Sequence, residues 1–136
     1  MTFLKLYLVS LSVFFFIDLF WLGVIAKDLY KDQIGFLMSS EVRWGPAILF
    51  YCLFMAGLSF FVIEPAFHKG NWVSALMYGG FFGLVCYATY DLTNLATLKG
   101  WPLKIVVIDL TWGTFISAIT SLITFSVGCH WKKYFI

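Results

Sequence analysis

The sequence predicts an all-α integral membrane protein, a four-helix bundle that forms one transmembrane domain over residues 1–136. Of the 136 residues, 62% are hydrophobic and only 12% are charged, which leaves too little polar surface for a water-soluble domain. The chain also contains four apolar runs of about the twenty residues that a helix needs to cross a bilayer. These runs are continuous rather than alternating, which favours helices over a transmembrane barrel.

Each predicted helix begins and ends at a recognisable signal. The first run contains Asp18 and lacks an Ala-x-Ala-type cleavage site, so we expect a retained helix rather than a signal peptide. The second and fourth helices begin near Pro46 and Pro102, which are preceded by the interfacial tryptophans Trp44 and Trp101. The predicted helices cover about residues 3–26, 47–67, 72–96 and 103–128.

The connections between the helices set the predicted topology. Pro65 and residues 68–71 close the second helix in a tight turn, whereas residues 27–45 form the only long link. This link is mildly amphipathic, so we expect it either to lie along the membrane interface or to fold over the bundle as a lid. An even number of helices places both termini on the same side. Lysine and arginine divide almost equally between the two sides, so the positive-inside rule does not decide the orientation. We expect cytoplasmic termini.

Charge and cysteine usage exclude several classes of protein. The net charge is +2, and no basic cluster exists beyond Lys132 and Lys133, so nucleic acid is not an expected partner. The three cysteines show no CxxC spacing, which argues against both a disulfide framework and a zinc site. Carboxylates beside an amide would suit Mg²⁺ or Ca²⁺, but no spacing motif for these ions is present. We therefore assign no metal site and no cofactor.

Three aspartates stand inside or at the edge of apolar runs, and Asp18, Asp91 and Asp109 each open a similar short phrase, as in Asp-Leu-Phe-Trp and Asp-Leu-Thr-Trp. A carboxylate in hydrocarbon costs several kcal/mol unless it is paired or neutralised, so intramembrane acids are usually functional. At about 1.5 Å per residue, all three lie roughly 8 to 12 Å from the boundary on the side of the long link. The sequence therefore predicts one acidic layer near one face of the bundle.

Polar companions stand close to each aspartate. Trp21, Asn94 and Trp112 each follow an aspartate by three residues and so share its helix face, while Tyr90 adds a hydroxyl at the same level. Arg43 enters the second helix at the same boundary and is the predicted countercharge. The predicted ligand-binding residues are Asp18, Trp21, Arg43, Tyr90, Asp91, Asn94, Asp109 and Trp112.

Small residues predict which helices pack closely. Gly79 and Gly83 form a GxxxG step in the third helix, and Gly113, Ser117 and Ser121 form a row at the same spacing in the fourth. Such rows allow two backbones to approach, so we expect the third and fourth helices to pack together. Either row would equally suit the interface of a homodimer.

Several stretches of the chain resemble a known family. They are the runs 87–102 and 108–113, together with Ile17-Asp18-Leu19-Phe20-Trp21-Leu22-Gly23 and Arg43-Trp44-Gly45-Pro46. This pattern resembles the bacterial predicted membrane proteins called domain of unknown function 2177, and the resemblance covers nearly the whole chain. It implies a multi-pass protein of the bacterial inner membrane and supplies no activity.

Three functional hypotheses follow from these residues. The first is an acidic intramembrane pocket near one face that binds a small cationic or amphiphilic ligand, with membrane lipid as the partner. Such a pocket would also suit a lipid-modifying enzyme, although no nucleophile and base pair is visible, so the question of catalysis stays open. The alternatives are an oligomeric proton- or cation-coupled transporter and a structural protein with polar contacts between helices only.

Overall fold

A computed structural model describes all residues 1–136 and contains helices and no strands. Four apolar helices are long enough to cross a membrane, and they cover residues 2–25, 44–69, 72–97 and 103–130. The predicted all-α class with four membrane helices is therefore confirmed. The largest difference from the predicted bounds is at the second helix, which begins at Trp44 rather than at residue 47.

Two of the four long helices contain a π-helical turn. The first long helix consists of α1 (Thr2–Phe20) and the π-helical turn η1 (Trp21–Ile25), and it is followed by the short helices α2 (Leu29–Ile34) and η2 (Gly35–Leu37). The remaining elements are α3 (Trp44–Leu58), η3 (Ser59–Ile63), α4 (Glu64–Lys69), α5 (Trp72–Thr97), α6 (Leu103–His130) and α7 (Lys132–Phe135).

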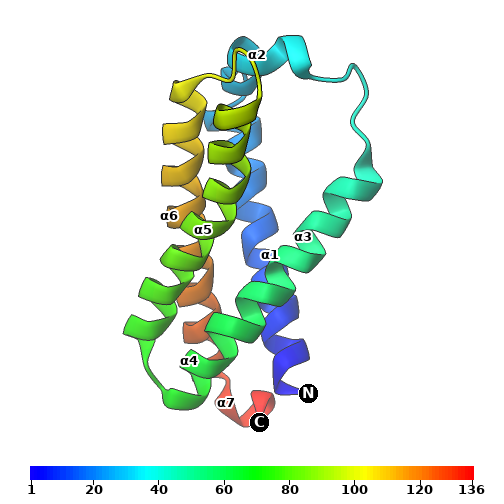
Figure 1. Ribbon diagram of the computed structural model, residues 1–136. Coiled ribbons are helices and arrows are strands. Elements are labelled where there is room, and N and C mark those ends of the chain that lie inside the picture. Colours follow the sequence, from blue (N-terminus) through cyan, green and yellow to red (C-terminus); the bar gives the residue numbers. More distant parts are fainter.

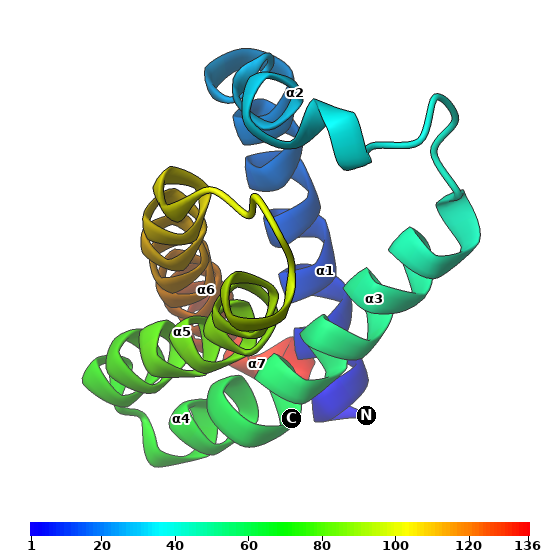
Figure 2. The same cartoon turned by 45° about the horizontal axis from the view of Figure 1, so that its top comes forward.

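The bundle is closed at one end and open at the other. Both termini lie at the closed end, beside α4 and α7, and α2 lies at the opposite end with the turn between α5 and α6 (Figure 1). Both views show α3 leaning away from α1 and α5 toward its N-terminal end (Figures 1 and 2). We call the end with the two termini the terminal end and the opposite end, with α2, the loop end. That the termini share one side of a membrane stays a prediction.

The second long helix contains Pro65 and ends at Lys69, two residues beyond the predicted end at residue 67. Proline lacks an amide hydrogen and its ring crowds the carbonyl one turn earlier, and the helix accommodates Pro65 by widening into η3 directly ahead of it. The helix is capped by Gly70, whose positive φ of 65° suits a residue without a side chain. Asn71 then caps α5, because its side-chain oxygen accepts hydrogen bonds from the amides of Val73 and Ser74.

Small residues bring α5 and α6 into close contact. A methyl group on Gly79 would lie 3.0 Å from the carbonyl oxygen of Ser117, and one on Gly83 would overlap the carbonyl oxygen of Gly113. The two predicted rows thus pack against each other within one chain. They are not available as the interface with a second copy.

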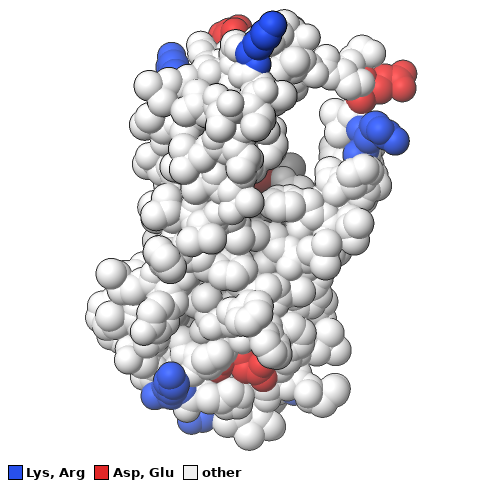
Figure 3. Space-filling model, viewed as in Figure 1, with Lys and Arg blue, Asp and Glu red and all other residues white.

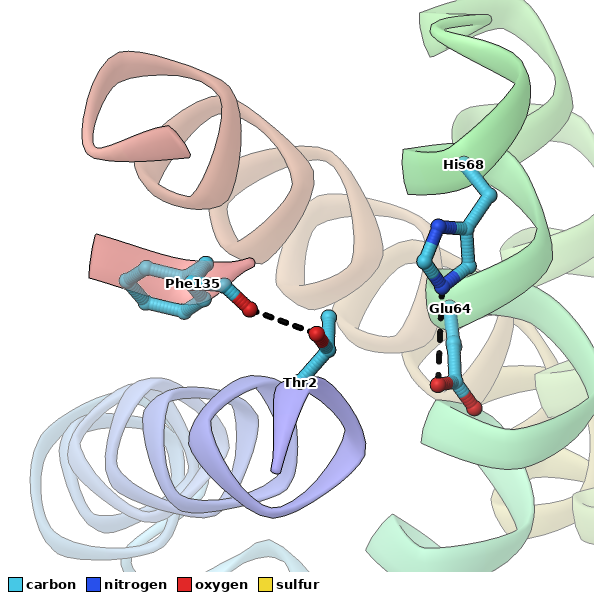
Figure 4. Close-up of polar contacts among 4 residues, drawn as sticks. All are labelled: Thr2, Glu64, His68 and Phe135. Carbon is cyan, nitrogen blue, oxygen red and sulfur yellow. Dashed lines mark hydrogen bonds and ion pairs between the residues drawn. The ribbon is translucent and has the colours of Figure 1, made fainter. Parts of the chain in front are cut away.

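Apolar packing fills the terminal end. Phe14, Leu58 and Ile63 are fully buried in a cluster of 12 buried apolar residues that α1, the second long helix, α5 and α6 share. The termini are also joined, because the Thr2 hydroxyl donates a hydrogen bond of 2.5 Å to the carbonyl of Phe135 (Figure 4). This end of the bundle is therefore closely packed.

The ion pair at the terminal end lies outside that core. His68 Nε2 lies 3.6 Å from a carboxylate oxygen of Glu64, one turn away on α4 (Figure 4). At the loop end, Leu29 and Ile34 of α2 pack against the buried cluster of Trp101, Ile105 and Val106. The connection between the first two long helices therefore lies over the loop end, as one of the two predicted arrangements has it.

We expect Gly83→Ala to lower the free energy of unfolding by about 1–3 kcal/mol, because the added methyl overpacks the contact between α5 and α6. Thermal unfolding of the protein in detergent measures the change. Gly45→Ala is the matched control, since a methyl group there meets nothing within 4 Å. Equal unfolding temperatures for the two variants would contradict this account of the contact.

Candidate functional site

A cavity of about 370 Å³ opens between the helices at the loop end, and we call it the acidic cavity. Figure 3 shows a hollow beneath the segment that connects η2 to α3, with acidic atoms visible on its wall. The cavity is lined by two carboxyl groups, six aromatic rings and two smaller apolar side chains. They are Asp18, Trp21, Leu22, Tyr30, Phe50, Cys86, Tyr87, Tyr90, Asp109 and Trp112.

Asp18 on α1 is held by donors from two other helices. The phenol of Tyr51 on α3 donates to one carboxyl oxygen, and the indole N–H of Trp112 on α6 donates to the other over 3.3 Å. The carboxyl group is buried, with 7% of the residue exposed. Neutral aromatic donors, rather than a cation, satisfy this acid.

Asp109 on α6 is held in a similar way by a donor on α2. The phenol of Tyr30 on α2 donates a hydrogen bond of 2.5 Å to Asp109 Oδ1, and it accepts one of 3.2 Å from the indole N–H of Trp21. Burial and the bond to Asp109 raise the pKa of Tyr30, so the phenol keeps its proton and remains a donor. Through Tyr30, α2 is attached to the acid layer.

The π-helical turn η1 supplies one wall of the cavity. The ring of Trp21 in this turn stacks on the ring of Trp112, with centroids 4.3 Å apart and planes within 10°. Leu22 of the same turn also lines the cavity. Single π-helical turns are rare, and they occur frequently at functional sites.

The structure brings five of the eight predicted residues together. Asp18, Trp21, Tyr90, Asp109 and Trp112 all line the acidic cavity. The predicted acidic layer thus corresponds to Asp18 of α1 and Asp109 of α6, which line the same cavity.

The other three predicted residues do not line the cavity. Asp91 is fully buried next to Asp109, and its carboxyl oxygens have no hydrogen-bond partner. Asn94 lies on the half-buried side of α5 farther toward the loop end. Arg43 is exposed and forms no ion pair, because the end of α3 that carries it leans away from the bundle. The predicted countercharge is therefore not brought to the acids.

Sequence reasoning missed the two most direct partners of the aspartates, Tyr30 and Tyr51. Tyr51 stands in a continuous apolar run, and no spacing relates it to Asp18. The amphipathic pattern of residues 29–34 was a usable signal for Tyr30, because it indicates a helix that turns one face toward the bundle. No group of three or more His, Cys, Asp or Glu side chains is placed to hold a metal ion.

Tyr51→Phe is expected to lower the free energy of unfolding by about 1–3 kcal/mol, because it removes a donor from the buried carboxyl group of Asp18. Tyr78→Phe is the control, since Tyr78 is 62% exposed on α5 and makes no side-chain hydrogen bond. Chemical unfolding in detergent compares the two. An effect of Tyr51→Phe no larger than that of Tyr78→Phe would show that the bond carries no stability.

Comparison with known proteins extends these observations. No curated protein matches the chain, and no solved structure matches it. One family does match, over residues 3–126, and it is described as predicted membrane protein, DUF2177. The match covers nearly the whole chain, including both cavity acids, so this protein belongs to the DUF2177 family of predicted membrane proteins.

Proposed function

We propose that the acidic cavity binds the positively charged headgroup of an amphiphile from the membrane. The observation that carries this proposal is the lining itself: Asp18 and Asp109 share a cavity with six aromatic rings, and no basic side chain lines it. Aromatic faces attract an ammonium group through their quadrupoles, and carboxylates attract it by charge. A bound cation would supply the countercharge that the protein does not place there.

The shape of the bundle supports an amphiphile over a free cation. Phe50 of α3 lines the cavity, and α3 leans away from α1 and α5 toward its N-terminal end, which would give a lipid chain access from the side of the bundle. Its volume of about 370 Å³ falls within the range of small-molecule sites, which are mostly apolar with a few polar groups. A headgroup would lie among the acids while its chain remains beside α3.

The same geometry gives little support to the transporter alternative. A path across the membrane would have to continue from the acids toward Glu64, but closely packed buried side chains lie in that half of the bundle, both apolar ones such as Phe14 and Leu58 and the hydrogen-bonded hydroxyls of Ser10 and Ser59. Nor do the two histidines lie near the cavity, since His68 and His130 belong to the terminal end. We therefore propose binding and assign no reaction.

We keep the expectation of a bacterial inner membrane protein with cytoplasmic termini as part of this proposal. In that orientation the loop end faces away from the cytoplasm, and the ligand comes from the outer leaflet. Membrane lipid is then the natural partner.

Binding of dodecyltrimethylammonium to the purified protein in nanodiscs tests the proposal, with tryptophan fluorescence as the signal, to which Trp21 and Trp112 in the cavity contribute. We expect saturable binding that weakens on the order of tenfold in Asp18→Asn and in Asp109→Asn, because each removes one attractive charge. Asp32→Asn, an exposed acid outside the cavity, is the control and should bind like the parent protein.

A second probe separates headgroup recognition from chain partitioning. Dodecyl sulfate has the same chain and the opposite charge, so its binding should not weaken in Asp18→Asn or in Asp109→Asn. Equal losses of the two probes in these variants, or undiminished ammonium binding in the Asp18→Asn/Asp109→Asn double variant, would refute the proposed function.

A further inference from the structure

A second cavity, of about 540 Å³, lies beside the first at the loop end, and we call it the basic cavity. It forms where the chain leaves η1 and passes through α2 and η2 toward α3. Two lysines and two serines line it, together with apolar side chains and a glycine, and no acidic residue does. The lining is Leu22, Ala26, Lys27, Tyr30, Lys31, Gly35, Met38, Ser39 and Ser40.

The two lysines of this cavity have no acidic partner. Asp28 and Asp32 follow them directly in the sequence, yet the only ion pair in the structure is the one between His68 and Glu64. The side-chain stem of Lys31 passes along Gly35, where its Cγ lies 3.6 Å from the position a methyl group would take. Two unpaired ammonium groups with neighbouring hydroxyls form a set of donors that suits a phosphate.

The level of the basic cavity matches that of lipid phosphates. The first membrane helix ends at Ile25, and Lys27 follows two residues later, so the lysines stand at the boundary of the apolar span. Lysines at this boundary keep their charge in the headgroup region while their stems remain apolar. A phosphate there needs no transfer into hydrocarbon.

The two cavities adjoin each other. Leu22 and Tyr30 line both of them. The phenol of Tyr30 is bonded to Asp109 on the acidic side, whereas Lys31 follows Tyr30 directly in α2 on the basic side. A cavity lined by acids and a cavity lined by lysines thus share Leu22 and Tyr30 in their walls.

We propose that the ligand is a zwitterionic amphiphile, in which a phosphate at Lys27 and Lys31 is joined by a short linker to an amine in the acidic cavity. This inference rests on the proposed function, because it takes the amine site from it, and adds a second anchoring site and the class of headgroup. The polarity of the two cavities also sets the orientation of the headgroup, with the amine beside Asp109 and the phosphate beside the lysines.

The experiment compares four probes on the purified protein in nanodiscs of neutral glycolipid. They are a short-chain phosphatidylethanolamine, dodecyl phosphate, dodecyltrimethylammonium and inorganic phosphate. The test variant is Lys27→Gln/Lys31→Gln. The matched control is Lys99→Gln/Lys104→Gln, which removes two exposed charges at the same end of the bundle but outside both cavities.

We expect the test variant to bind phosphatidylethanolamine and dodecyl phosphate more weakly, on the order of tenfold, while the control variant binds them like the parent protein. Binding of dodecyltrimethylammonium, which has no phosphate, should be the same in all three proteins. Unchanged binding of phosphatidylethanolamine in the test variant, or equal losses in test and control variants, would overturn the inference.

Two further outcomes separate this inference from the proposed function. If dodecyltrimethylammonium fails to bind the parent protein while dodecyl phosphate binds through the lysines, the amine site fails, and with it both the proposed function and the zwitterionic ligand. If inorganic phosphate binds as tightly as dodecyl phosphate, the basic cavity is a site for free phosphate, and the assignment to an amphiphile is wrong.

Discussion

Two carboxyl groups inside a membrane bundle impose the constraint on which the loop end depends. A buried acid without partners is costly in this setting, and here the partners are neutral aromatic donors on other helices. Tyr51 and Trp112 donate to Asp18, and Tyr30 donates to Asp109. These bonds connect α1 to α3 and α6, and α2 to α6. They hold together the end of the bundle from which α3 leans outward.

The two ends of the bundle are therefore stabilised by different means. In a bilayer, apolar surfaces gain little by leaving lipid for each other, so helix contacts depend on close packing and polar bonds. Gly79 and Gly83 allow α5 and α6 to pack closely midway along the bundle, and apolar side chains fill the terminal end. Bulky rings such as Trp21 and Trp112 occupy the loop end instead. At this end α3 leans away from α1 and α5, and the acidic cavity lies between the helices.

The sequence predicted the features that depend on local pattern. Apolar runs and prolines located the four helices, and the rows at Gly79 and Ser117 identified the closest helix pair. Depth along a helix is also local, which is why Asp18 and Asp109 were predicted at one level.

Helix rotation and tilt are not local properties. The tilt of α3 takes Arg43 away from the acids, and the rotation of α5 turns Asp91 into the protein rather than the cavity. Tyr51 reaches Asp18 through the packing of α3 against α1, so no spacing in the sequence pointed to it.

Structural bonds and ligand binding are compatible roles for the two cavity acids. A carboxylate offers about four acceptor positions. Asp18 uses two of them for Tyr51 and Trp112, and Asp109 uses one for Tyr30, so acceptor positions remain on both acids that line the cavity. Asp91 differs, because its buried oxygens have no partner and do not line the cavity. The aromatic donors thus fix the direction of each carboxyl group while leaving part of it open to a ligand. Contacts between helices alone would account for the bonds, but they would not require an acid-lined cavity beside them.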